Sequence, residues 1–101
     1  MSEIVSILNK DGSCAPQYRE LLSDDDILVL FKTIILNRVM DRRLMMLQRQ
    51  GRIGFYLTST GEEAVTVGAA HALNEDDPIF LSYREMGALL VRGVPMNAIM
   101  N

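Results

Sequence analysis

Several residue types are scarce in this sequence, and their scarcity narrows what the chain can do. Its 101 residues include one cysteine, one histidine and no tryptophan. A single cysteine, Cys14, excludes an internal disulfide and is typical of a reducing compartment. We interpret it as an incidental thiol in a loose segment. The only histidine, His71, has no second metal ligand close to it in the sequence, which favours packing or binding at a helix end over a metal site.

Long apolar runs and a strong charge imbalance are also missing. No uncharged apolar run approaches the roughly 20 residues of a membrane-spanning helix. The N-terminus, MSEIVSILNKDG, lacks the basic start of a signal peptide. The net charge of −3 argues against a general nucleic-acid-binding surface. The 49% hydrophobic content is that of a folded protein. We therefore expect a cytoplasmic protein with neither a membrane nor a nucleic acid as its main partner.

The pattern divides the chain into a lead-in over residues 1–22, which we expect to be extended, and one domain segment over residues 23–101. Ser23 is a good helix N-cap, and the three aspartates after it suit the positive end of the helix dipole better than a calcium loop. No glycine or proline follows until Gly51, which predicts a helix over 24–50. A helix of about 26 residues is roughly 39 Å long. It needs other elements or a partner subunit to cover it.

Positive charge gathers in the second half of this long helix and just after it. Two interpretations remain open for these side chains. They complement the negative helix end and aid solubility, or they form a contact surface for a partner. The residues concerned are Arg38, Arg42, Arg43, Arg49 and Arg52.

A second helix is predicted over residues 61–73. Two overlapping Ser/Thr-x-x-Glu patterns, Ser59 with Glu62 and Thr60 with Glu63, match a capping box at its start. Capping explains both glutamates without a catalytic role. Small residues then recur every four positions, which predicts a bare ridge that another backbone can approach closely. These residues are Ala64, Gly68 and Ala72.

Polar residues follow at a predicted junction between a strand over 79–81 and a helix over 85–92. A helix start at the end of a strand exposes backbone N–H groups that attract anions. Arg84 offers a planar fork that can bind two phosphate oxygens, and Tyr83 adds a neutral donor. The alternative is that Arg84 pairs with a carboxylate such as Glu85 or Glu62. The residues alone leave both open, and the sequence shows no nucleotide-binding loop and no nucleophile–base pair.

The C-terminal residues predict one more short helix. Pro95 suits a first helical turn, but the apolar pattern stops at Asn101 after about a turn and a half. A helix that short is not stable alone, so we expect the chain to be the front part of a longer protein.

The ordered motifs QRQG, FY, GEEA and YRE within residues 48–87 resemble a known family. They look like the N-terminal part of the alpha subunit of the thiamine-diphosphate-dependent 2-oxoacid dehydrogenases, the E1 components. The resemblance covers roughly residues 22–101. It is greatest to the branched-chain 2-oxoacid (2-oxoisovalerate) dehydrogenase, with the pyruvate and acetoin enzymes as the next relatives.

The resemblance implies an α/β, thiamine-diphosphate-binding fold, of which this chain is a mostly helical portion. It implies oxidative decarboxylation of a 2-oxoacid and acyl transfer to the lipoyl group of E2, in an α2β2 heterotetramer. Tyr83 and Arg84 match the residues that hold the cofactor's diphosphate, which decides between the two readings of Arg84. Phe55 matches a substrate-pocket residue. Ser82 stands where a relative carries glutamine, which affects the pocket's shape.

The same resemblance implies that this segment holds no catalytic residue of its own. The activating glutamate belongs to the β subunit, so Glu62 and Glu63 do not take that role. The ligands of Mg²⁺ and the catalytic histidine are expected downstream, so we expect the segment alone to be inactive. In a eukaryote the location would be the mitochondrial matrix. The alternative from another functional class is a noncatalytic helical module for subunit packing.

Overall fold

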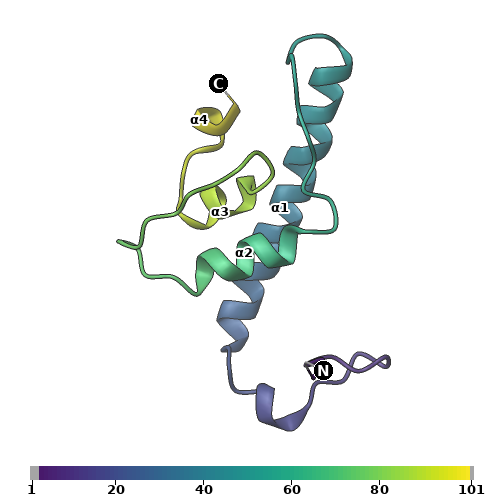
Figure 1. Ribbon diagram of the computed structural model, residues 1–101, viewed down its shortest axis with the longest axis vertical. Coiled ribbons are helices and arrows are strands. Elements are labelled where there is room, and N and C mark those ends of the chain that lie inside the picture. The colour runs from purple at the N-terminus through teal and green to yellow at the C-terminus, as the bar shows by residue number, and fades with distance from the viewer. Residues whose placement is uncertain (1–2, 101) are drawn as a thin grey trace.

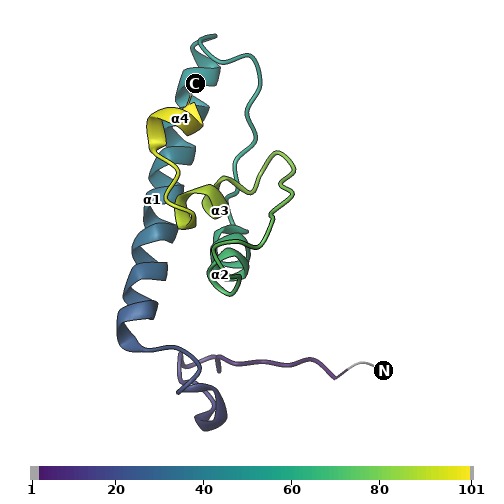
Figure 2. The same ribbon diagram turned by 90° about the vertical axis from the view of Figure 1, so that its left-hand side faces the viewer.

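The computed structural model describes residues 3–100 and is built from helices around one long helix (Figures 1 and 2). A short 3₁₀ helix η1 (Pro16–Tyr18) precedes α1 (Asp24–Arg49). The shorter α2 (Glu63–His71), α3 (Met86–Val91) and α4 (Met96–Met100) follow. Figure 1 shows α3 and α4 beside α1, Figure 2 shows α2 and α3 beside it, and in both the lead-in extends away from the N-terminal end of α1.

Local sequence defines both ends of α1. The Ser23 hydroxyl accepts a hydrogen bond from the Asp26 N–H at 3.1 Å, and the Asp26 carboxylate accepts one from the Ser23 N–H at 3.3 Å. This reciprocal capping box satisfies two helix-end donors. At the other end Gly51 has a φ of 72°, which favours glycine and stops the helix. The predicted helix over 24–50 is therefore confirmed to within one residue.

The core lies where α1, α2 and α3 meet. Its buried apolar side chains come from all three helices: Met40, Leu44, Val67, Ala70 and Ala88. The closest helix approach is at Gly87, where an added Cβ would lie 3.0 Å from atoms of Asn37, Thr66 and Val67. At Gly68 an added Cβ would meet nothing within 4 Å. Within residues 3–100, the close packing predicted for the Gly68 ridge is therefore found at Gly87 instead.

The strand predicted over 79–81 is not formed in the part of the chain that the structure describes. Residues 79–81 run without regular structure alongside α3, and exposure alternates, with Phe80 94% exposed between two half-buried neighbours. A strand also needs a neighbour to pair with its N–H and C=O groups, and none lies beside it here. The α/β class is accordingly not shown, and the described segment is helical.

Large apolar side chains remain exposed on α1 between residues 27 and 39. They are Ile27, Leu28, Val29, Phe31, Ile35, Leu36 and Val39. In the described range 3–100, no helix combines the length and apolar character that crossing a bilayer requires. The exposed side chains agree with the expectation that such a long helix needs further elements to cover it.

Candidate functional site

Arg84 sits at the start of α3 with an incomplete set of partners. Its side chain is 40% exposed, and Nη1 lies 3.8 Å from Glu62 Oε1. Its guanidinium carbon lies 5.7 Å from the centre of the Tyr83 ring. The Nε atom is buried and has no hydrogen-bond partner. A buried donor without a partner is uncommon in folded proteins and calls for an explanation.

The two carboxylates considered for Arg84 take different positions. Glu62 is the one near it, at a distance longer than a hydrogen bond. Glu85 instead accepts a hydrogen bond from the Ser82 N–H at 2.8 Å. Tyr83 is 58% exposed beside them. The structure thus places Ser82, Tyr83 and Arg84 in one exposed turn and leaves guanidinium donors available.

Phe55 lies away from this turn, in the loop between α1 and α2. It is 69% exposed and lines a cavity of about 390 Å³ whose other walls come from α1, α3 and α4. Ser82 does not line this cavity, so the structure does not bring the two expected substrate-pocket residues together. The lining residues are Leu44, Arg52, Ile53, Phe55, Tyr56, Met86, Ile99 and Met100.

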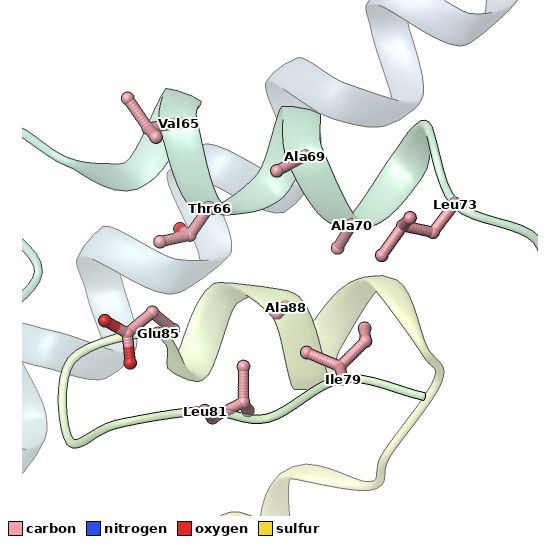
Figure 3. A pocket seen from close by; sticks show the side chains of 9 residues that line it. All are labelled: Val65, Thr66, Ala69, Ala70, Leu73, Ile79, Leu81, Glu85 and Ala88. Atoms are coloured by element: carbon pink, nitrogen blue, oxygen red, sulfur yellow. The ribbon is translucent and has the colours of Figure 1, made fainter. Parts of the chain in front are cut away.

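A second cavity lies between α2, α3 and the segment over residues 79–81 (Figure 3). It measures about 250 Å³, and Ile79 and Leu81 point into it from the segment beside α3. Its other walls are mostly apolar, and the Glu85 carboxylate lies at one end. These walls come from Val65, Thr66, Ala69, Ala70, Leu73 and Ala88. An apolar slot with one carboxylate does not suit an anion, so it is not the predicted phosphate site.

A buried polar network joins α1 to the loop before α2. We name it the Asp41 cluster: Asn37, Asp41, Tyr56 and Ser59. Asp41 is 2% exposed and accepts hydrogen bonds from the Ser59 N–H at 3.0 Å and the Ser59 hydroxyl at 2.8 Å. Its other oxygen accepts one from the Tyr56 hydroxyl. Asn37 Nδ2 donates to the Ser59 hydroxyl at 3.0 Å.

The Asp41 cluster changes the chemistry of Tyr56 and the start of α2. Burial, reinforced by the hydrogen bond to Asp41, raises the pKa of Tyr56 far above its usual range. The Ser59 hydroxyl donates to the buried Asp41 carboxylate and accepts from Asn37, so it does not accept the backbone N–H groups at the start of α2. The capping boxes predicted from Ser59 and Thr60 are therefore wrong, and α2 begins at Glu63 without a side-chain cap. Sequence reasoning missed this cluster, although two polar residues spaced i, i+4 within an apolar helix were a usable signal.

Glu63 forms a buried ion pair that ties α2 to α1. Its carboxylate, 3% exposed, lies 2.8 Å from Arg38 Nε. It also accepts the Gly61 N–H at 2.8 Å. The hydrogen bond from Arg38 holds the pKa of Glu63 below its ordinary value. Both contacts give Glu63 a structural role in joining α2 to α1.

The Glu63 ion pair predicts that the protein loses stability in acid. The folded-state pKa is lower than the ordinary 4.5, so the pair stabilises fully above that value and less as pH falls through the folded-state pKa. Urea unfolding midpoints should fall between about pH 5 and about pH 3. Glu63→Gln should flatten this part of the profile. An equally steep profile in the variant would assign the acid sensitivity to other carboxylates.

The remaining charged residues show no metal site in the part of the chain that is described. No group of three or more His, Cys, Asp or Glu side chains gathers there.

His71 Nε2 lies 3.7 Å from Asp26 Oδ1, linking the end of α2 to the start of α1. Arg38, Arg42 and Arg49 line an open depression of about 500 Å³ together with Thr58 and Thr60.

Comparison with known proteins places this segment in a family. The family model described as dehydrogenase E1 component matches residues 31–101. The chain is 40% identical over 97 residues, 95% of its length, to the mitochondrial 2-oxoisovalerate dehydrogenase subunit alpha of Dictyostelium discoideum. It is 47% identical over 91 residues, 90% of its length, to that of Caenorhabditis elegans. The human subunit is 40% identical over 98 residues, 96% of the chain.

The alignments cover only a small part of each relative. The chain covers 22% of the Dictyostelium and human subunits and 20% of the nematode one, about a fifth of the relatives' length. No solved structure is significantly similar to it. The family model nevertheless matches most of the chain, and the relatives agree with it. The chain therefore belongs to the dehydrogenase E1 component family.

Proposed function

We propose that this chain is the N-terminal part of the alpha subunit of a branched-chain 2-oxoacid dehydrogenase E1 component. The whole enzyme would decarboxylate a 2-oxoacid oxidatively and transfer the acyl group to lipoyl-E2. The support is the family match together with relatives that are named as 2-oxoisovalerate dehydrogenase subunits. The pyruvate and acetoin enzymes are the runners-up for substrate.

The observation that carries the proposal is the state of Arg84. The E1 family in general uses thiamine diphosphate, which supplies the nucleophilic carbon and electron sink for decarboxylation. Arg84 fits an oxyanion of that cofactor, because its Nε is buried without a partner and its nearest carboxylate is 3.8 Å away. Arg84 would neutralise the diphosphate, and the Tyr83 hydroxyl would donate to it. The Mg²⁺ ligands are expected outside residues 1–101.

The substrate side of the proposal rests on Phe55. The cavity that it lines is mostly apolar, with Leu44, Ile53 and Met86 among its walls. Such a lining suits the aliphatic side chain of a branched 2-oxoacid. Ser82, from the neighbouring turn, would shape the pocket only if further parts of the enzyme join the two regions.

The partners follow from the same proposal. A β subunit would complete the α2β2 heterotetramer and contribute the activating glutamate, and a lipoylated E2 would accept the acyl group. Exposed apolar side chains on α1 leave a large surface for other parts of the assembly. The Dictyostelium and human relatives are named as mitochondrial, which favours the matrix for a eukaryotic source; the expectation for a bacterial source is the cytoplasm.

Arg84→Ala tests the proposed cofactor contact in the full-length subunit assembled with β. The half-saturating concentration of thiamine diphosphate should rise about 10- to 100-fold, the loss expected for charge-assisted hydrogen bonds. Activity would be followed by 2-oxoacid-dependent NADH formation in the reconstituted complex. Arg84→Lys keeps the charge without the fork and should give an intermediate value. An unchanged cofactor requirement in Arg84→Ala would remove the diphosphate role.

The exposed apolar surface of α1 favours one second candidate, a noncatalytic packing module. This candidate predicts a stable complex with a partner subunit whose formation and stability do not depend on thiamine diphosphate. Thermal unfolding of the purified complex, with and without the cofactor and Mg²⁺, separates the two. A cofactor-induced rise in the unfolding temperature supports the enzyme.

A further inference from the structure

We propose that Asp41 and Tyr56 are positioning residues that aim Phe55 into the 2-oxoacid pocket. This inference rests on the proposed function, because it gives Phe55 a substrate to contact. Asp41 does not line the cavity that Phe55 lines; Tyr56 does, and its hydroxyl is held by Asp41. Asp41 acts on Tyr56 through a buried hydrogen bond, and Tyr56 acts on its neighbour through the backbone.

Unequal burial of two neighbouring side chains in the loop is the first step. Residues 55–59 run between α1 and α2 without helix or turn structure. Tyr56 is half-buried with its hydroxyl on Asp41, while Phe55 is 69% exposed. The bond to Asp41 fixes the backbone at residue 56, and this sets the direction in which the adjacent Phe55 side chain leaves the loop.

A second attachment removes the remaining freedom of the loop. Ser59, three residues further on, gives Asp41 both its backbone N–H and its hydroxyl, at 3.0 and 2.8 Å. Asn37 donates to the same hydroxyl from one helical turn earlier on α1. A segment held at residues 56 and 59 by one buried carboxylate cannot rotate about its own axis without breaking these bonds. Asp41 is itself in the long helix α1, which makes it a rigid support.

The cavity geometry connects this support to substrate fit. Phe55 and Tyr56 line the 390 Å³ cavity together with Leu44, which is on α1 close to Asp41. Met86, two residues after Arg84, forms part of another wall. Arg84 itself lies just before α3, near Glu62, and does not belong to the Asp41 cluster. Loosening Tyr56 should therefore disturb the 2-oxoacid more than the diphosphate.

Tyr56→Phe in the full-length subunit assembled with β provides the test. It removes one hydroxyl and keeps the ring. The KM for 2-oxoisovalerate should rise about 5- to 10-fold, the effect of about one hydrogen bond. The kcat and the half-saturating concentration of thiamine diphosphate should stay within about twofold. Amide hydrogen exchange over residues 55–59, followed by mass spectrometry, should become faster.

Val67→Ala is the matched control, because Val67 is fully buried in α2 and outside the Asp41 cluster. It should lower the unfolding temperature but leave the KM and the exchange of residues 55–59 unchanged. Ser59→Ala removes the hydroxyl of the second attachment and should also raise the KM. It replaces Tyr56→Phe as the test variant if Tyr56→Phe does not assemble.

The outcomes separate this inference from the proposed function. If Tyr56→Phe and Ser59→Ala are both active and both keep the wild-type KM, the positioning role alone is overturned. The same KM rise in Val67→Ala also overturns it, because general destabilisation would then explain the effect. A correctly assembled wild-type enzyme that binds thiamine diphosphate but turns over no 2-oxoacid overturns the proposed function and this inference together.

Discussion

Replacing Asp41 with alanine is expected to lower the free energy of unfolding by about 4 kcal/mol. The substitution leaves the Tyr56 hydroxyl and both donors of Ser59 without their buried acceptor. Each unsatisfied buried polar group costs about 1–3 kcal/mol, and relaxation or entering water recovers part of the sum. Urea unfolding, followed by circular dichroism, measures the change.

Asp41→Asn is the control for this prediction. It keeps the size of the side chain and one acceptor oxygen, so it should lose roughly half as much stability. A change below about 1 kcal/mol in Asp41→Ala would show that water or another group replaces the carboxylate. The loop before α2 would then owe its conformation to something other than the Asp41 cluster.

Gly87→Val is expected to destabilise the protein by about 3 kcal/mol or more. A Cβ at this position would already lie 3.0 Å from Asn37 Nδ2, Thr66 Oγ1 and Val67 Cγ2. Overpacking of this kind typically costs 1–3 kcal/mol, and valine adds two methyl groups beyond the Cβ. The neighbouring atoms come from α1 and α2, so relieving the clash requires α3 to move away from both helices.

The other helical glycine gives a matched comparison. Gly68 lies in α2 with nothing within 4 Å of an added Cβ. Gly68→Ala should therefore raise the free energy of unfolding by up to about 1 kcal/mol through helix propensity. Gly87→Ala should instead be destabilising. Equal effects of alanine at the two positions, measured by chemical denaturation, would contradict the packing described for α3.

Features that depend on neighbouring residues in the sequence were predicted well. The start of α1 follows from Ser23 and Asp26, which satisfy each other's backbone donors within one turn. Its end follows from Gly51, and α3 and α4 were expected at nearly their observed positions. These signals are local, so they need no knowledge of what packs against them.

Features that depend on distant residues were missed or misread. Ser59 has the spacing of a capping residue, but Asp41, 18 positions earlier, captures its hydroxyl. The close helix approach was expected at Gly68 and lies at Gly87, because tertiary packing selects which glycine is covered. Residues 79–81 have the composition of a buried strand, yet no pairing partner lies beside them in the described segment. The sequence pattern of one segment does not show whether a second strand lies beside it.

The candidate site was predicted in part. The sequence and its resemblance single out Arg84, and the structure shows which acid lies near it and that its Nε has no partner. The proximity of Glu62 to Arg84 depends on α2 and α3 packing side by side, which the spacing of residues in the sequence did not show. The roles of Tyr83, Arg84, Phe55 and Ser82 in binding stay predictions.

The buried Nε of Arg84 has a thermodynamic consequence for whatever anion reaches it. This N–H group is shielded from water in the folded chain, so folding has already stripped its hydration shell. An oxyanion that bonds this donor does not have to dehydrate it, although the anion's own hydration, its lost translational freedom and the turn of the side chain that exposes Nε still oppose binding. Folding therefore removes in advance the part of the dehydration cost that belongs to this donor.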